Sequence, residues 1–547
     1  MSRKFAIGLL AVVVVLAIGG GLLFRNALPG LSSARPAPPA IEIAVATWLL
    51  LHSVPAADAE RVNPLSPTEA GLAAGAALFQ QNCAVCHGFD GGGRTMIGTN
   101  VYPRAPALRQ ALPALTDGQV FTFVHDGIRN TAMPAWHLPD NDIWQIVLFL
   151  RHLPPTAARE AEQTASVAGS HYVGSAACQS CHTEIFARWR KTRMANVVRD
   201  PREHPEAFIP DFSKPDPLLT FTKDDVAFVY GSRWKQRYFT RRGDDYFPLP
   251  AQWDITNHRW LKYHVPLTGG DWWAPLYPDD NMQRPTGPLC DGCHSVNYDI
   301  ATKTVTEWNV GCESCHGAGS EHAAHPLRTN IINPARLDYV AANDTCIRCH
   351  SQGRPPTNPI NGKYFDWPVG FHMGLNLSDF WALETYKPGE ATFMQFPDGT
   401  SHKNRMQGND FVQSLMYTRG VTCFSCHDPH GNDNVSLLRA RGNSLCLTCH
   451  GPNAQTGPFA ASIEAHTHHK PDSTGSLCVS CHMPKIEETL GDVKVHAHTF
   501  RFITPTETQT LEIPNACNLC HADKTPAWAS DILKSWKDRS PWRMGNN

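Results

Sequence analysis

Residues 423–430 read Cys-Phe-Ser-Cys-His-Asp-Pro-His, and the first five of them are one copy of a pattern that recurs along the chain. The pattern Cys-x-x-Cys-His occurs nine times and uses all 18 cysteines. Its cysteine pairs are Cys83/Cys86, Cys178/Cys181, Cys290/Cys293, Cys312/Cys315, Cys346/Cys349, Cys423/Cys426, Cys446/Cys449, Cys478/Cys481 and Cys517/Cys520. The histidines that complete it are His87, His182, His294, His316, His350, His427, His450, His482 and His521.

The spacing of this pattern is typical of covalent haem attachment. Two thiols three positions apart lie on one side of a helical turn, where each can add across one vinyl group of a haem. The imidazole that follows is then carried to the iron as its proximal ligand. Zinc ribbons need no histidine after the second cysteine, and thioredoxin-like pairs do not recur nine times. The sequence therefore predicts nine covalently bound c-type haems.

The overall composition excludes one class of function. The chain has 547 residues and a formal net charge of −2, so it lacks the basic excess that nucleic-acid binding needs. Its 42% of hydrophobic residues is an ordinary globular value. We therefore expect no nucleic-acid partner.

The N-terminus predicts export. Arg3 and Lys4 precede an uncharged run from Phe5 to Phe24, about 20 residues, which at about 1.5 Å each can cross a membrane core of about 30 Å. Residues 1–24 are thus expected to be a membrane anchor, with a cleaved signal peptide as the alternative. Residues 25–66 read as a Pro-rich linker with a short apolar helix near 41–51. Both interpretations place the rest of the chain on the periplasmic side of the inner membrane or outside the cell.

Residues 67–155 contain a single motif and predict a domain of their own. Helical patterns flank the motif at 69–81 and 140–152, and Met133-Pro134 follows it. This arrangement resembles a class I monohaem cytochrome c, and the resemblance implies that Met133 is the sixth iron ligand. The alternative is that Met133 packs in the core and that His125 or His137 is the ligand.

Residues 171–547 hold the other eight motifs, after a polar, Ala-rich linker at 156–170. About 47 residues per motif are too few for a self-sufficient core, so the porphyrins themselves are expected to form it. The predicted fold is mainly α-helical with much coil, interrupted by motif-free insertions at about 201–285 and 351–420. Alternating aromatic residues around Gly243-Asp244 predict a small β-rich region in the first insertion, either a docking face or lid or a cover for haem edges.

Eighteen histidines lie outside the motifs, more than the eight irons of this region need as distal ligands. His52, His152 and His204 are expected to be surface residues. The candidates for distal ligands are His322, His325, His372, His402, His430, His468, His469 and His498, with His466 and His496 beside them in sequence.

Three segments carry a resemblance over most of 171–547. They are residues 172–182, residues 312–319 with the order Cys-Glu-Ser-Cys-His-Gly-Ala-Gly, and residues 423–431. They look like the multihaem cytochromes related to the tetrahaem cytochrome of ammonia oxidisers and to hydroxylamine oxidoreductase. The resemblance implies closely stacked, mainly bis-histidine haems, with His322, His430 and His498 as distal ligands. It also implies a histidine where this chain has Met194, so the second haem or its neighbour is Met-ligated, served by a histidine from elsewhere, or open. The alternative is that Met194 only packs in a helix.

Three functions follow from the ligand count. If every iron has two axial ligands, the protein is an electron carrier that exchanges electrons with other redox proteins or with a membrane redox complex. If one iron is open, it is a multihaem oxidoreductase acting on a small nitrogen or sulfur compound. The third possibility is a haem-wire subunit of a larger assembly. No Cys-x-x-Cys-Lys variant occurs, so the lysine-ligated site of pentahaem nitrite reductases is absent.

Overall fold

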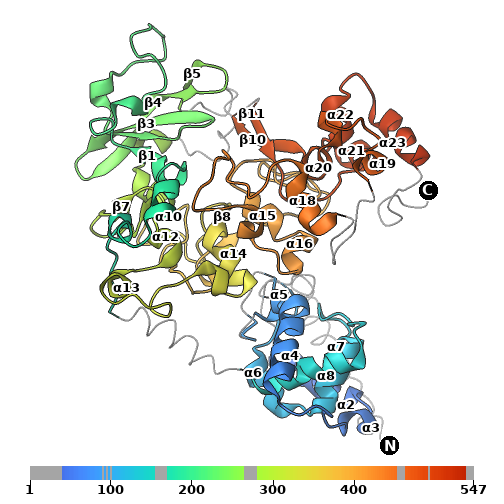
Figure 1. Cartoon of the computed structure of the whole chain (residues 1–547). Helices are drawn as coiled ribbons and strands as arrows, with labels where there is room; N and C mark the ends of the chain where they lie inside the picture. Colours follow the sequence, from blue (N-terminus) through green and yellow to red (C-terminus); the bar gives the residue numbers. More distant parts are fainter. Residues whose placement is uncertain are drawn as a thin grey trace, which may run out of the picture. The chain divides into compact units, whose positions relative to one another are not determined.

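The computed structural model describes residues 40–88, 91–93, 97–98, 101–153, 169–263, 280–451, 462–490 and 493–536. The chain divides into two compact units, Met1–Pro154 and Pro155–Asn547 (Figure 1). No helix among the described residues is both long and apolar enough to cross a membrane. The expected anchor at 5–24 lies outside those residues, as does most of the expected linker at 156–170.

Unit 1 is built from helices around one apolar core. Its helices are α2 (Ala40–Ser53), α3 (Ala56–Ala59), α4 (Glu69–Asn82), α5 (Ala84–His87), α6 (Leu108–Ala111), α7 (Asp117–Asp126) and α8 (Asp140–Arg151). The two helices that the sequence predicts at 69–81 and 140–152 are α4 and α8. Helix α4 begins at Thr68, whose hydroxyl accepts a hydrogen bond from the Gly71 N–H at 3.1 Å. The apolar face of α8 forms the centre of the core, where Ile143 and Ile146 are fully buried.

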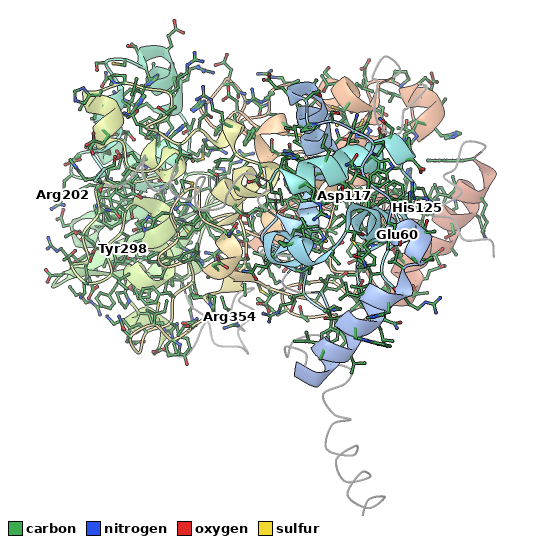
Figure 2. The ribbon with its side chains drawn as sticks, turned by 90° about the horizontal axis from the view of Figure 1, so that it is seen from below. Glu60, Asp117, His125, Arg202, Tyr298 and Arg354 are labelled. Carbon is green, nitrogen blue, oxygen red and sulfur yellow. The ribbon has the colours of Figure 1, made fainter. Side chains whose placement is uncertain are left out.

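Helix α2 differs from the rest of unit 1 because its apolar side chains are in solvent. Ile43, Val45, Trp48 and Leu49 are each more than half exposed. The helix stands out from the body of its unit (Figure 2). It corresponds to the short apolar helix that the sequence predicts near 41–51.

A five-stranded antiparallel sheet lies in the first motif-free insertion of unit 2, with its first strand just before it. Its strands follow one another in the order β1 (Val198–Arg199), β2 (Phe228–Tyr230), β3 (Lys235–Arg242), β4 (Asp245–Asp254) and β5 (Arg259–Lys262). The predicted hairpin is present, since Arg242 pairs with Asp245 across the Gly243-Asp244 turn. Gly243 has a φ of 61°, which a glycine adopts without strain.

Both faces of this sheet are covered. On one face, Tyr238 and Trp260 pack with the preceding loop around Phe221. On the other face, Phe228, Tyr230 and Phe239 pack with Tyr263, and Cys290 and Trp308 lie against them. The sheet therefore lies directly over the motif at Cys290.

The rest of unit 2 consists of short helices and loops. The helices that include or adjoin motif residues are α10 (Thr183–Trp189), α11 (Gly292–His294), α12 (Glu313–His316), α14 (Tyr339–Ile347), α17 (Cys423–Cys426), α18 (Asn443–His450), α20 (Cys478–His482) and α22 (Ala516–Cys520). Between them lie α13 (Ser320–Ala324), α15 (Gln407–Phe411), α16 (Leu415–Thr418), α19 (Ile463–Thr467), α21 (Pro505–Leu511) and α23 (Pro526–Ser535). Three two-stranded ribbons pair β6 (Ser295–Val296) with β7 (Glu307–Trp308), β8 (Gly353–Arg354) with β9 (Ala382–Leu383), and β10 (Lys485–Leu490) with β11 (Val493–His496).

The close crossing of α4 and α8 depends on one glycine. A Cβ on Gly75 would lie 2.2 Å from the Gln145 carbonyl oxygen. We expect Gly75→Val to force the two helices apart and to destabilise unit 1 by about 1–3 kcal/mol. Hydrogen–deuterium exchange of the α4 and α8 amides in the full chain measures this effect. Gly71→Ala on the same helix is the control, because its Cβ would meet only side-chain atoms at 3.1 Å and 3.5 Å and a carbonyl oxygen at 3.9 Å. Unchanged exchange in Gly75→Val would contradict the prediction.

Candidate haem-attachment sites

Each motif folds as one tight helical turn. The backbone N–H of His316 donates to the Cys312 carbonyl at 3.0 Å, and that of His427 donates to the Cys423 carbonyl at 3.0 Å. All 18 motif cysteines are free thiols in the bare polypeptide, and none forms a disulfide. The turn thus presents two free thiols and an imidazole together. Covalent attachment requires this arrangement, because each thiol adds to one vinyl group of the haem.

The motif cysteines are not equally buried. Cys83 and Cys293 are buried, whereas Cys181, Cys449 and Cys520 are exposed in the bare polypeptide. Each of the three exposed residues is the second cysteine of its motif. Thioether bonds form at the vinyl groups on the porphyrin edge, so an exposed cysteine remains suited to haem attachment.

Four motif histidines face a second histidine across a gap. His182 faces His322 with ring centroids 6.3 Å apart, and His316 faces His430 at 6.0 Å. Near the C-terminus, His482 faces His466 at 6.2 Å and His521 faces His469 at 6.3 Å. In the first three pairs the ring planes differ by 13°, 8° and 12°, and in the fourth by 37°.

The width of this gap fits an iron atom between the two rings. Two in-line metal–nitrogen bonds of about 2 Å separate the facing nitrogens by about 4 Å, and the two half-rings extend the centroid distance to about 6 Å. Direct aromatic stacking would bring near-parallel rings closer together. The residues present therefore fit two-sided axial ligation of a haem iron.

Hydrogen bonds to Nδ1 orient several of these rings. The Nδ1 of His316 lies 2.7 Å from the Ile332 carbonyl, that of His322 lies 3.0 Å from the Leu327 carbonyl, and that of His469 lies 2.6 Å from the Thr467 carbonyl. A carbonyl can only accept, so each bond assigns the proton to Nδ1 and leaves Nε2 free for a metal.

His350 has a partly enclosed position. It is exposed by surface area, yet burial lowers its pKa. The adjacent Cys346 and Cys349 make a haem the group that this position fits.

Glu313 joins two motifs that are far apart in sequence. Its carboxylate is buried and accepts hydrogen bonds from the N–H groups of Val173 at 3.0 Å, Gly174 at 2.7 Å and Gly319 at 2.8 Å. The segment before Cys178 is thereby held against the segment after His316. This contact explains why His322 can reach the ring of His182.

Two further distal candidates, His498 and His372, form no ring pair with a motif histidine in the described residues. Burial, and secondarily the charge of His427, lowers the pKa of His498 to about 4. The Nδ1 of His498 lies 2.9 Å from the His496 carbonyl, so its Nε2 is free. The Nδ1 of His372 lies 3.3 Å from the Tyr172 hydroxyl.

The remaining candidates have other neighbours. His402 lies 3.5 Å from a Glu488 carboxylate oxygen, and His468 stacks on Trp536 with centroids 4.3 Å apart. His325 is exposed just after α13. Met194 lies in a 3₁₀ turn, and its carbonyl accepts a hydrogen bond from the Val310 N–H. The ring that faces His182 is that of His322, not the Met194 side chain.

In unit 1, Met133 is half-buried, and its carbonyl accepts from the Ile128 N–H at 3.1 Å. His125 is exposed at the end of α7 and lies 2.6 Å from Asp126, and His137 is exposed (Figure 2). His52, His152 and His204 are exposed, as the sequence predicts.

Sequence reasoning did not single out His466 among the three histidines of 466–469. Ser462 caps α19 by accepting from the Ala465 N–H at 3.0 Å, and the helix carries His466 towards His482. His468 then ends the helix in a left-handed conformation, with a φ of 55°, and turns to Trp536. The serine cap three residues before Ala465 is the sequence signal that predicts this helix.

His294 has different surroundings. The ring nearest to it among the described residues is that of Tyr230, at 5.5 Å, whose hydroxyl donates to Asp291 at 2.9 Å. Burial, and then the charges of Arg405 and Arg237, lower the pKa of His294 to about 4. The environment of this motif is thus cationic.

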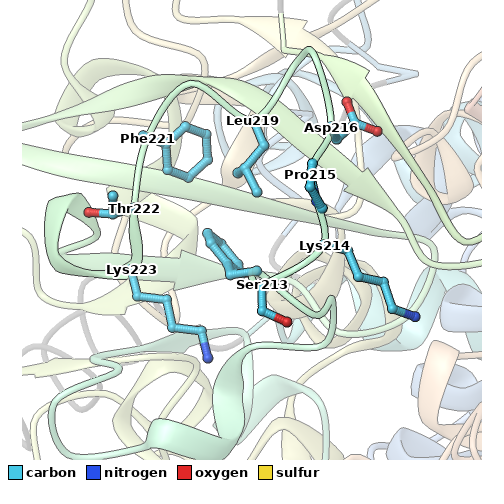
Figure 3. Close-up of a pocket in the computed structure, with 9 residues that line it drawn as sticks. Ser213, Lys214, Pro215, Asp216, Leu219, Phe221, Thr222 and Lys223 are labelled. Carbon is cyan, nitrogen blue, oxygen red and sulfur yellow. The ribbon is translucent and has the colours of Figure 1, made fainter.

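A surface depression on the first insertion is unrelated to the motifs. It is lined by Phe212–Asp216, Leu219 and Phe221–Lys223, and the amino groups of Lys214 and Lys223 lie at its edge (Figure 3). It contains neither cysteine nor histidine, so it is not an attachment site.

Comparisons with known proteins agree with this chemistry. The family model of the cbb3-type cytochrome c oxidase subunit III matches residues 70–150, that of cytochrome c554 and c-prime matches 278–317, and that of the doubled CXXCH motif matches 417–455. The dissimilatory sulfite reductase MccA of Wolinella succinogenes is 20% identical over 326 residues. That match covers 47% of this chain and 41% of that protein, so the chain spans less than half of the relative's length.

One solved structure shares the fold. The outer cell wall cytochrome OcwA superposes with a TM-score of 0.54 and 19% identity, over 67% of this chain and 87% of that one. Two cytochrome family models and a doubled CXXCH motif match along the chain, and a cytochrome is similar in structure. The motifs of the chain combine thiols and imidazoles as haem attachment requires. The chain is a multihaem c-type cytochrome.

Proposed function

We propose that this protein is an exported electron carrier with nine haems, one in unit 1 and eight in unit 2. The observation that carries the proposal is the set of four imidazole pairs with centroids 6.0 to 6.3 Å apart. An iron held between two imidazoles has no position left for a substrate. Bound haem supplies reversible one-electron transfer, and the chain supplies the ligands and excludes water.

We assign the distal ligands from these pairs. His322 serves the haem of His182, and His430 serves the haem of His316. His466 serves the haem of His482, and His469 serves that of His521. His498 is assigned to the haem of His427, because the charge of His427 lowers the pKa of His498. In unit 1 the ligands are His87 and Met133.

We further propose that electrons move from unit 2 to unit 1. Methionine–histidine ligation raises the reduction potential of an iron above that of bis-histidine ligation. The haem of His87 is therefore the expected exit, from which a separate redox protein or a membrane complex takes the electrons.

The proposed location is the periplasmic side of the inner membrane, with residues 5–24 as the anchor. The exposed apolar side chains of α2, including Trp48 and Leu49, support a position at a lipid surface. A cleaved signal peptide is the alternative, and it gives a secreted protein.

A second candidate function is reduction of a small oxyanion at the haem of His294. Tyr230 rather than a histidine is the ring neighbour of His294 in the described residues, and Arg405 and Arg237 make its surroundings cationic. The similarity to a sulfite reductase points to the same class of reaction. In this case the iron of His294 keeps an open position.

The spin state separates the two candidates. For the carrier we expect nine haems per chain by pyridine haemochrome and only low-spin ferric signals by electron paramagnetic resonance, because every iron has two axial ligands. Cyanide, nitrite and sulfite should leave the absorption spectrum unchanged. A high-spin signal that disappears on adding one of these anions would instead establish the second candidate.

The ligand assignment near the C-terminus has a matched test. We expect His466→Ala to convert one haem from low spin to high spin, because its iron loses a ligand. Added imidazole should restore the low-spin signal. His468→Ala is the control, since that ring stacks on Trp536 and should leave all spin states unchanged. A high-spin haem in the control variant alone would refute the assignment.

The direction of transfer is tested by potentiometric titration. We expect the haem of unit 1 to have the highest midpoint potential of the set. Met133→His should lower that one potential and leave the others in place, since histidine is the more electron-donating ligand. If the highest midpoint potential is unchanged in Met133→His, Met133 is not an iron ligand of the haem from which electrons leave.

A further inference from the structure

Arg405 is a half-buried cation without an ion-pair partner among the described residues. Its Nη2 donates to the Gln352 side-chain oxygen at 2.9 Å and, at 3.5 Å, to the Asp366 carbonyl. Its Nε is buried and donates to no atom in the described part of the chain. A buried N–H without an acceptor is costly, so this edge of the guanidinium is suited to an acceptor that the described residues do not provide.

These contacts place Arg405 between two attachment motifs. Gln352 follows His350 by two positions, and the N–H of Asp366 donates to the carbonyl of Pro288, two positions before Cys290, at 2.9 Å. The motifs also meet directly, since Cys293 Sγ lies 3.9 Å from the Arg348 carbonyl oxygen.

The backbone holds Arg405 in an unusual conformation. Its φ is 62°, in the left-handed region that non-glycine residues rarely adopt. The neighbours on both sides are fixed: the Asn404 N–H donates to the Glu488 carbonyl at 2.9 Å, and the Gly408 N–H donates to the His350 carbonyl at 2.8 Å. Strain maintained in this way is typical of residues that serve a ligand.

The Asp366 carboxylate does not pair directly with Arg405. Burial raises the pKa of Asp366, and the charges of Arg405, Arg284 and Arg354 oppose that rise. Of the Asp366 oxygens, only the backbone carbonyl is within hydrogen-bond distance of the guanidinium. The buried Nε therefore has no acceptor among the described residues.

We propose that Arg405 binds a propionate carboxylate of haem between the motifs of His294 and His350, and thereby raises the potential of that haem. This inference rests on the proposed function, because it requires haem at both motifs. A guanidinium binds a carboxylate through charge-assisted hydrogen bonds. The positive charge of the guanidinium offsets the negative charge of the propionate. It therefore favours the reduced iron, which carries one positive charge fewer than the oxidised iron.

Three variants test the proposal by potentiometric titration of the full chain. Arg405→Gln should lower the midpoint potential of one or both neighbouring haems by about 59 mV, equivalent to about tenfold in the redox equilibrium. Arg405→Lys keeps the charge and should shift the potentials less. Arg354→Gln is the matched control, because Arg354 is exposed on β8 and also acts on Asp366 (Figure 2). It should leave the potentials unchanged.

Two further readouts separate failure of this inference from failure of the proposed function. Nine haems in each variant, with unchanged potentials in Arg405→Gln, would overturn the role of Arg405 alone. Fewer than nine haems in the wild-type protein would overturn the nine-haem proposal on which it rests. If sulfite or nitrite shifts the spectrum of the wild-type protein but not of Arg405→Gln, the bound anion is a soluble oxyanion, and the propionate assignment is wrong. Should Arg405→Gln fail to fold, Arg405→Lys still tests the proposal. Lysine keeps the positive charge, so a midpoint potential lowered by the full amount of about 59 mV in this variant would contradict the role of the charge.

Discussion

Two imidazoles that face each other across about 6 Å constrain unit 2 more than any apolar contact does. The gap between them is too wide for direct contact and is suited to a metal ion with one ring on each side. Each such pair joins two segments that are distant in sequence, as His182 and His322 do. The segments between the two histidines of a pair can then be loops or short helices. The histidine pair, rather than a long helix or strand, fixes where these segments lie.

The pairs also interlock the chain in a regular way. His322 follows the motif of His316 but faces His182, and His430 follows the motif of His427 but faces His316. Each of these motif segments thus contributes one imidazole to its own site and a second to an earlier one. Hydrogen bonds such as those of Glu313 to Val173 and Gly174 hold the two segments together without a large apolar interface. A chain of this kind brings its sites close together, which is the geometry that electron transfer between them requires.

The two units use different sources of stability. Unit 1 packs α8 into a conventional apolar core, in which Ile143 and Ile146 have no exposed surface. In unit 2 the larger aromatic clusters belong to the five-stranded sheet. Among the motif helices, α14 buries most of its residues, whereas α10, α17, α18 and α20 bury none. No motif histidine is buried in the bare polypeptide. This is expected where the cofactor occupies the centre, since residues that line its site are exposed until it is present.

The sequence by itself determined the attachment chemistry. Spacing within Cys-x-x-Cys-His is a property of one helical turn, and the structure closes that turn at motif after motif by a hydrogen bond between the motif's own residues. Local patterns likewise predicted α4, α8 and the hairpin between β3 and β4, because capping residues, helical periodicity and a Gly-Asp turn act within a few residues.

Only the tertiary structure decided how much of each motif cysteine the polypeptide covers and which histidine meets which motif. Cys181 and Cys293 occupy the same position in their motifs, yet the first is exposed and the second is buried. His466 and His468 are two positions apart and chemically identical, yet one faces His482 and the other stacks on Trp536. These differences depend on where an element such as α19 ends and on how it packs, which are long-range properties.

The position of Arg405 between two motifs is of the same kind. Gln352, Asp366 and Pro288 are far apart in sequence and come together only through the path of the whole chain. Local patterns act over a few residues, so they determine the attachment turn but not the charge that lies beside it.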